Sequence, residues 1–316
     1  MRFLFVMDPA DTMHPEKDTS FAFIRGAQAR GHSVYHAEAR GLRAEGRSVH
    51  ATARPIRVSP TPPHFTLGEP ERLAVEALDA VFIRKDPPFD SAYLYLTHLL
   101  DLVKDRVLVL NDPRGIRDAN EKLFAFRFSE FTPRSLVTAS PAEIAAFVQE
   151  VGEAVLKPLD GAGGAGVVVL KHGDRNVRSL SDIWTAEGKR LALVQEYQPA
   201  IRTGDKRVLV LDGRSIGAIL RVPREDDVRA NIHAGGRVVA TELTPREDEL
   251  VRAIGPKLVE HGLYFVGLDL IGERLIEVNV TSPTGIQELS RFAGRPVEED
   301  VIAWVETRSR TFSRPA

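Results

Sequence analysis

The chain has 316 residues and contains no cysteine. Disulfide bonds, thiolate nucleophiles and cysteine-ligated metal sites are therefore excluded. Long apolar runs are also absent: the first one stops at Asp8, short of a secretory signal, and none reaches the roughly 18 residues of a membrane span. We therefore expect a soluble cytoplasmic protein that has no membrane partner.

An excess of charge of either sign is missing as well. The formal net charge is -2, which gives no reason to expect a nucleic-acid partner. Hydrophobic residues make up 43% of the chain and charged residues 27%, as is ordinary for a globular protein. The length suggests roughly two to three domains.

The first part of the chain alternates apolar runs with helical patterns. Residues 3–7 and 33–36 are predicted strands, separated by a predicted helix at 20–30. Such strand-helix-strand units build parallel sheets. Two further strands are expected at 79–84 and 107–110, around a helix at 91–103, whereas 37–70 supports little assignment.

Later segments mix strands and helices less regularly. Ser140, Pro141 and Glu143 indicate a capping box at the start of a helix, and another helix is expected to begin at Asn120. A long helix is predicted at 246–261. The expected strands are 154–158, 167–171, 191–194, 206–211, 216–222, 264–270 and 275–280.

A glycine-rich loop lies between two of these strands. Its glycines, which let backbone N–H groups approach an anion, are Gly161, Gly163, Gly164 and Gly166. Neither a P-loop nor a dinucleotide fingerprint fits the loop, and alone it fits a hairpin turn equally well. Lys157, in an otherwise apolar strand, needs an anionic partner unless it reaches solvent at an edge. With Lys122 it would suit a polyphosphate.

An acidic cluster is the most specific chemical signal. Glu277 and Asn279 are two residues apart in a predicted strand and share a face, while Ile276, Val278 and Val280 are expected on the other face. These apolar neighbours favour burial over a solvated acidic face.

The preceding strand contributes Asp269. A hairpin with a three-residue loop, 272–274, would pair Ile271 with Leu275 and set Asp269 opposite Glu277. A two-residue loop would instead put the two carboxylates on opposite faces. Carboxylate and carboxamide oxygens select Mg²⁺ or Mn²⁺ over Zn²⁺.

Two other stretches have the character of binding segments. Gln195, Glu196 and Tyr197 follow a buried strand and form a plausible edge for adenine. The charged stretch 223–237 ends in Gly235 and Gly236 and has few apolar residues, as is typical of a lid or a disordered loop.

Together these residues resemble the ATP-grasp superfamily, and local strings resemble bacterial glutathione synthetase from the first strand to about Leu289. The strings are VMDP (6–9), RKDPPFD (84–90), NEKLF (120–124), KPLDGAGGAG (157–166), GDKRVLV (204–210), AGGR (234–237), FVGLD (265–269) and EVNVTSPTGI (277–286). The resemblance implies a mixed α/β ATP-grasp fold. It divides the chain into a Rossmann-like N-terminal pre-ATP-grasp domain (1–119), a central lid subdomain (120–200) and a C-terminal catalytic subdomain (201–316).

The family also implies a reaction. ATP would phosphorylate the cysteinyl carboxylate of γ-glutamylcysteine, and the glycine amine would displace phosphate from the acyl phosphate to give glutathione. The resemblance further implies Mg²⁺ or Mn²⁺, with two ions, and a homotetramer. Two alternatives stay open: another ATP-grasp carboxylate–amine ligase, such as a D-alanine or glutamate ligase, and a non-catalytic nucleotide-binding protein.

Residue roles follow from motif position. For ATP, the resemblance implies phosphate contacts from Lys122, Lys157 and the glycine loop, and a ribose contact from Asp205. Catalytic roles would fall to Arg207, Arg229 and Asp269, and metal binding to Asp269, Glu277 and Asn279. The peptide would contact Arg84, Asp86, Arg207, Gly235, Gly236, Ser282, Pro283 and Thr284.

Overall fold

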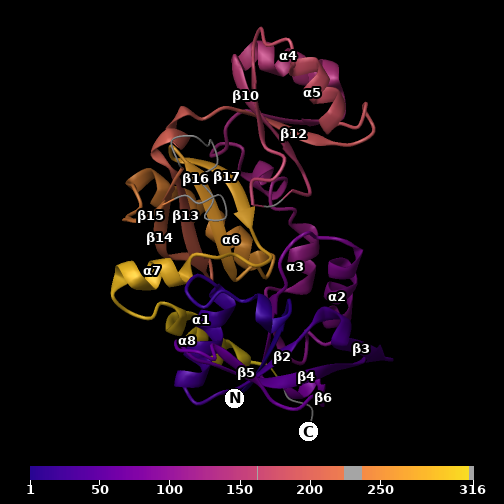
Figure 1. Ribbon diagram of the computed structural model, residues 1–316, viewed down its shortest axis with the longest axis vertical. Helices are drawn as coiled ribbons and strands as arrows, with labels where there is room; N and C mark the ends of the chain where they lie inside the picture. Colours follow the sequence, from indigo (N-terminus) through magenta and orange to yellow (C-terminus); the bar gives the residue numbers. More distant parts are fainter. Residues whose placement is uncertain (162, 224–236, 313–316) are drawn as a thin grey trace.

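The structure is a computed structural model that describes residues 1–161, 163–223 and 237–312. Three sheets follow one another along the long axis of the molecule (Figure 1). The N-terminal sheet has eight strands, the middle sheet five and the sheet at the far end four. This mixture of parallel and antiparallel sheets with helices confirms the α/β prediction. No helix in the described ranges is long and apolar enough to cross a membrane.

The N-terminal sheet has a parallel centre, as its strand-helix-strand pattern predicts. β1 pairs in parallel with β2 and β7, and β7 pairs in parallel with β8. Its central strand is apolar and buried from Phe3 to Met7, as expected where both faces of a sheet are covered. The elements are β1 (Arg2–Met7), α1 (Thr19–Ala29), β2 (Ser33–Ala37), β7 (Ala80–Arg84), α2 (Ser91–Asp101), β8 (Leu108–Leu110) and α3 (Pro113–Asp118).

The stretch that resisted assignment extends this sheet with antiparallel strands. β4 (Ser48–Val58) pairs with β2 on one edge and also with three short strands. Val49, Ala51 and Ala53 alternate with more exposed residues along it. Two of these buried residues are alanines, whose small side chains give little hydrophobic signal, so the alternation of buried and exposed positions is hard to recognise in the sequence. The short strands are β3 (Leu42–Glu45), β5 (Phe65–Leu67) and β6 (Glu71–Ala74).

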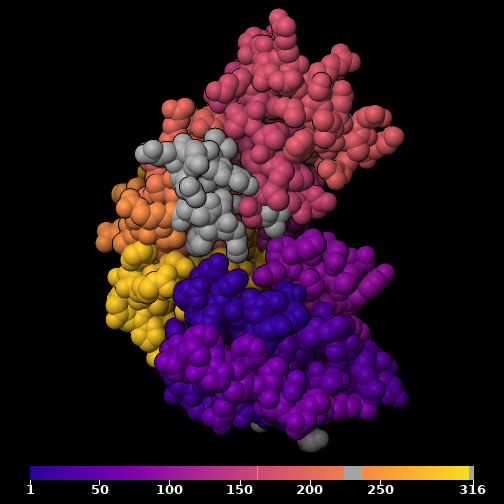
Figure 2. All heavy atoms as spheres, viewed as in Figure 1, coloured from indigo at the N-terminus to yellow at the C-terminus, as the bar shows by residue number. Residues whose placement is uncertain are grey.

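The four-stranded sheet has its own small core under α4 and α5. Its strand order is β11-β10-β12-β9, and all its pairs are antiparallel. In the space-filling view this lobe projects beyond the other two sheets (Figure 2). Its elements are β9 (Ser135–Thr138), α4 (Pro141–Val151), β10 (Glu153–Pro158), β11 (Val168–Lys171), α5 (Val177–Trp184) and β12 (Ala192–Glu196).

Two helix-start predictions near this lobe need correction. Ser140 caps α4 by accepting from the Glu143 N–H, but the Glu143 carboxylate accepts from Thr138 Oγ1, so the reciprocal capping box is wrong. Asn120 does not begin an α-helix either. Its side chain accepts from the N–H groups of residues 122 and 123 in a turn, and a 3-10 helix follows at Phe124–Phe128.

The five-stranded sheet is antiparallel and buried on both faces. Val208 and Val210 join the core with α6, whereas Leu209 and Leu211 join the core with α1, α7 and α8. Both cores continue into the N-terminal sheet, so these two parts are packed as one block. The elements are β13 (Asp205–Leu211), β14 (Arg214–Val222), β15 (Arg237–Thr241), α6 (Pro245–Glu260), β16 (Phe265–Ile271), β17 (Arg274–Asn279), α7 (Ile286–Ala293) and α8 (Glu298–Ser309).

Candidate active site

The β16–β17 hairpin sets Asp269 opposite Glu277, as predicted. The predicted three-residue loop is wrong, however, because Ile271 pairs with Arg274. Gly272 and Glu273 form a two-residue turn with φ of 55° and 65°, the positive values that a type I′ hairpin turn requires.

A β-bulge explains how a two-residue turn still pairs the carboxylates. Leu270 pairs with Leu275 and Asp269 with Glu277, which leaves Ile276 as an extra residue on β17. The bulge shifts the face of the strand by one residue. Ile276 consequently lines a pocket instead of joining Val278 and Val280 in the core.

Asp269 is held by two arginines. Arg207 donates to both of its oxygens, at 2.5 and 2.9 Å, and Arg221 lies 2.9 Å from Oδ2. Burial by itself would raise the pKa of Asp269, but the two guanidinium groups more than offset burial and hold that pKa below its usual value. This carboxylate therefore stays ionised at neutral pH.

Arg221 also binds a second buried carboxylate. Its Nε and Nη2 donate to the two oxygens of Asp205, both at 2.6 Å. Burial raises the pKa of Asp205, and the nearby Asp269 raises it further, against the effect of Arg221. The expected ribose contact at Asp205 thus lies in the pocket wall with both oxygens already paired.

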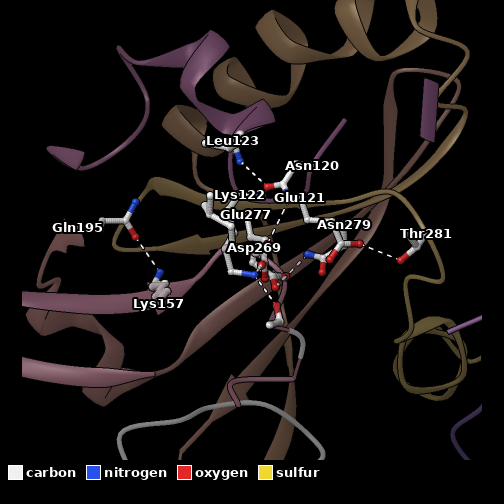
Figure 3. A network of polar contacts seen from close by, with 12 residues as sticks. Asn120, Glu121, Lys122, Leu123, Lys157, Gln195, Asp269, Glu277, Asn279 and Thr281 are labelled. Carbon is white, nitrogen blue, oxygen red and sulfur yellow. Dashed lines mark hydrogen bonds and ion pairs between the residues drawn. The ribbon is translucent and has the colours of Figure 1, made fainter. Parts of the chain in front are cut away.

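Glu277 is paired with a lysine from the segment before the four-stranded sheet. Lys122 Nζ lies 3.0 Å from Glu277 Oε1. It also donates a hydrogen bond to the Gly161 carbonyl oxygen at 2.5 Å. The side-chain amide of Asn279 donates a hydrogen bond from Nδ2 to Asp269 Oδ2 at 3.2 Å. Figure 3 shows Lys122, Glu277, Asp269 and Asn279 converging at one place. The predicted cluster is therefore assembled.

The second predicted lysine has a neutral partner. Lys157 donates to Gln195 Oε1 at 2.9 Å (Figure 3), and Gln195 in turn donates to Ser135 Oγ at 3.0 Å. The described residues place no carboxylate in salt-bridge range of Lys157, so the expected anionic partner is not found in the described part of the chain. Burial lowers the pKa of Lys157 to about 8.

An apolar pocket, which we call the inter-sheet pocket, lies between the four-stranded and five-stranded sheets. Val155, Val167 and Val169 come from the first side, and Ile201, Ile271 and Ile276 from the other. A flat apolar ligand would fit between such layers. The polar side chains and glycines of its lining are Lys122, Lys157, Gly161, Gly163, Gly164, Gln195, Glu196, Tyr197, Gln198, Asp205, Asp269 and Glu277.

A second pocket, the polar pocket, opens between the N-terminal sheet and the five-stranded sheet. The buried Arg84 donates to Ser20 Oγ at 3.2 Å and to the Pro283 carbonyl at 3.1 Å. Burial lowers the pKa of Arg84 and raises that of Asp86. The pocket is also lined by the predicted peptide contacts Arg207, Ser282, Pro283 and Thr284.

The two pockets meet at three residues. Gly163, Asp269 and Glu277 line both of them. A ligand in one pocket can therefore reach a ligand in the other past the acidic cluster. Three predicted residues, Arg229, Gly235 and Gly236, lie outside the described part of the chain, as does most of the lid expected at 223–237.

Sequence reasoning missed two residues of this site. Arg221 lies among the apolar residues Ile219, Leu220 and Val222 of β14, the same signal that singled out Lys157. Glu121 lines the polar pocket and accepts from Thr281 Oγ1 at 2.9 Å. Burial raises the pKa of Glu121, and the nearby Glu277 adds to that rise.

The acidic cluster is small by the standard of a protein-only metal cage. Within the described ranges, no group of three or more His, Cys, Asp or Glu side chains is arranged to hold a metal ion. The cluster offers two carboxylates and one carboxamide, Asp269, Glu277 and Asn279. This donor set suits an ion that completes its coordination with ligand oxygens.

Sequence comparison gives one consistent family. The model of the prokaryotic glutathione synthetase N-terminal domain matches residues 1–117, and that of the ATP-grasp domain of the same enzyme matches 121–294. The glutathione synthetase of Gloeobacter violaceus is 44% identical and covers 100% of this chain and 98% of that protein. That of Agrobacterium fabrum is 44% identical and covers 92% of each.

Solved structures give the same fold at much lower identity. The ATP-grasp ligase PsnB, complexed with precursor peptide PsnA2 and AMPPNP, aligns with a TM-score of 0.63 at 19% identity over 98% of both chains. D-cycloserine synthetase DcsG aligns with a TM-score of 0.66 at 12% identity over 96% of this chain and 99% of that chain. At these identities the likeness shows the ATP-grasp fold alone.

The family match spans nearly the whole chain, including the residues that line the two adjoining pockets. The protein is accordingly an ATP-dependent ligase with glutathione synthase function. The chain belongs to the prokaryotic glutathione synthetase family.

Proposed function

We propose that ATP occupies the inter-sheet pocket, that γ-glutamylcysteine occupies the polar pocket, and that the phosphoryl group passes between them at Asp269 and Glu277. The observation that carries this proposal is the wall that the two pockets share, lined by Gly163, Asp269 and Glu277. Phosphoryl transfer depends mainly on positioning and electrostatics, and this arrangement supplies both.

The nucleotide would lie with its base between the two apolar layers and its phosphates toward the lysines. Gln195, Glu196 and Tyr197 line the pocket and would face the adenine. Among the described residues the one hydrogen-bond partner of the half-buried Lys157 is neutral, so a phosphate would supply the anion that this lysine calls for. Lys122, already joined to the glycine loop, would bring a second charge to the same phosphates.

A divalent ion fits this site together with a nucleotide. Among the described residues, Asp269 is already paired with Arg207 and Arg221, and Glu277 with Lys122. Phosphates would compete for those cations and release carboxylate oxygens. Asp269, Glu277 and Asn279 would then hold Mg²⁺ or Mn²⁺, which would neutralise charge on the phosphates. Two ions are proposed from the family pattern.

The polar pocket would recognise the zwitterionic γ-glutamyl end of the peptide. The described residues leave the buried Arg84 guanidinium without a carboxylate in salt-bridge range, so a substrate carboxylate would stabilise it. Asp86, also in the pocket, would take the ammonium group. Ser282, Pro283 and Thr284 would position the peptide beside Arg207, which donates to the Thr284 carbonyl at 3.2 Å.

The proposed sequence of bonds needs no enzyme nucleophile. The cysteinyl carboxylate attacks the γ-phosphorus, ADP leaves, and an acyl phosphate forms. The glycine amine then attacks the acyl carbon, loses a proton, and the tetrahedral intermediate expels phosphate. Arg207 and Arg221, beside Asp269, would stabilise charge on the transferred group. Arg229, Gly235 and Gly236 remain proposed as the segment that excludes water.

The test of the substrate assignment is a ligase assay that follows ADP release. We expect ADP only when γ-glutamylcysteine, glycine and a divalent ion are all present. α-Glutamylcysteine, which carries the same atoms in the other linkage, is the matched control for the zwitterion contacts. ADP release with D-alanine or glutamate acceptors, and none with glycine, would contradict the assignment.

Two properties that the family resemblance implies, a homotetrameric assembly and a cytoplasmic location, are part of this proposal. A homotetramer is checked by light scattering of the purified protein, where a monomer mass would contradict it. A cytoplasmic location agrees with the need for ATP and for a reduced thiol substrate. Fractionation of cells that express the protein tests it.

A further inference from the structure

A hydrogen bond from α5 holds the end of the glycine loop. Trp184 Nε1 donates to the Gly166 carbonyl oxygen at 2.7 Å. Gly166 does not line the inter-sheet pocket itself, although Gly161, Gly163 and Gly164 do. The contact therefore fixes the loop from behind, on the side of the four-stranded lobe.

The loop has little conformational order of its own. Gly163, Gly164 and Gly166 have φ of 62°, 77° and 71°, values that only glycine adopts readily and that leave the free loop many conformations. Among the described residues, two side chains from outside the loop donate to its carbonyl groups. Lys122 donates to Gly161 and Trp184 to Gly166. The loop is thus tied at each end.

The backbone beside Trp184 is held in place by buried contacts. Thr185, the next residue, is fully buried, and its hydroxyl donates to the Ser181 carbonyl at 2.7 Å. The Thr185 carbonyl accepts from the N–H groups of Lys189 and Arg190 at 2.9 and 2.7 Å. The Trp184 ring packs against the small core of the lobe, while its N–H reaches the loop.

We propose that Trp184 is a positioning residue for ATP, acting through the glycine loop. Its N–H restricts the loop to the conformation that covers the phosphates, so ATP does not have to order the loop when it binds. This inference rests on the proposed nucleotide site. It predicts a larger effect on ATP than on the peptide, because Gly161, Gly163 and Gly164 line the inter-sheet pocket whereas Gly163 is the one loop glycine that lines the polar pocket.

The test is Trp184→Phe, which keeps an aromatic ring and removes the N–H. One net hydrogen bond corresponds to about a two- to tenfold change in an equilibrium constant. We expect the KM for ATP to rise by about that factor, with a smaller change in the KM for γ-glutamylcysteine and the melting temperature as in the wild type. Trp304→Phe is the matched control, since the chain has only two tryptophans and Trp304 packs against Tyr264, 5.0 Å away.

Two results would overturn the proposal. One is a wild-type KM for ATP in folded Trp184→Phe. The other is an equal change in both KM values together with a lowered melting temperature, which would indicate a structural role alone. If Trp184→Phe does not fold, the Trp304→Phe protein retains Trp184 as its one tryptophan. Its emission should change when Mg²⁺ and ADP are added, and constant emission would overturn the proposal.

The outcome for Trp184 can be separated from that for the nucleotide site. Full activity of Lys157→Met would count against the site as a whole. An inactive Lys157→Met combined with a wild-type KM for ATP in Trp184→Phe would count against Trp184 alone.

Discussion

Raising the pH above 8 should weaken ATP binding by removing the proton from Lys157. Burial lowers the pKa of this lysine from 10.5 to about 8 in the protein without ligand. Its only hydrogen-bond partner in the described structure is the neutral Gln195 side chain. A bound triphosphate would stabilise the charged form and return the pKa toward its ordinary value. Binding of ATP is therefore coupled to uptake of a proton.

The size of the effect follows from that pKa. At pH 9 about one unliganded molecule in ten carries the charged lysine, so the apparent affinity for ATP falls about tenfold relative to pH 7. Each further pH unit lowers the apparent affinity for ATP roughly another tenfold, or about 1.4 kcal/mol of binding free energy, until the pH reaches the pKa of Lys157 in the complex. The same depressed pKa makes a stability contribution that is present above pH 10.5 and lost as pH falls through about 8.

The assay is the KM or dissociation constant for ATP between pH 7 and pH 9.5, with Mg²⁺ saturating. Lys157→Met is the control, because it has a similar shape and no proton to lose. It should bind ATP weakly at every pH and lack the slope. A flat profile for the wild type, or an equal slope in Lys157→Met, would refute the assignment of Lys157 to the phosphates.

Three other changes test the site and the packing around it. Glu277→Gln should lower turnover by at least about 100-fold at an unchanged melting temperature, and unchanged turnover would remove the metal hypothesis. Arg221→Met leaves buried Asp205 unpaired and should destabilise the protein by about 3–5 kcal/mol in urea unfolding; a loss below about 1 kcal/mol would refute that pairing energy. Gly255→Ala improves helix propensity by about 1 kcal/mol, but its Cβ would lie 2.1 Å from the Gly213 carbonyl oxygen. We expect a net loss of about 1–3 kcal/mol, contradicted by a raised melting temperature.

The strands and long helices were largely predictable because their patterns are local. The apolar run of β1 and the helical spacing of α6 depend on neighbours within a few residues, and both elements lie where the sequence predicts them. β4 escaped prediction because its buried positions include alanines, which carry little hydrophobic signal. The start at Asn120 was misjudged because its side chain caps a turn instead of an α-helix.

The acidic hairpin shows how a correct pairing can follow from a wrong turn. The alternation of Asp269, Glu277 and Asn279 required the two carboxylates to share a face, and they do. The sequence could not reveal that a bulge at Ile276, instead of a longer loop, provides the shift. Bulges depend on how the strand packs against its neighbours, and here Ile276 is drawn into the inter-sheet pocket.

The sequence by itself determined the chemistry of the site, because residue types and short spacings specify oxygen ligands, buried cations and a glycine loop. Tertiary structure decided which charges neutralise one another. Arg221 meets Asp205 from the neighbouring strand and Asp269 from two strands away, and Lys122 meets Glu277 across 155 residues of chain, from Lys122 to Glu277. Such pairings depend on the distance between folded elements, which no local pattern records. The same holds for the meeting of the two pockets at Asp269 and Glu277, where three sheets must first be packed together.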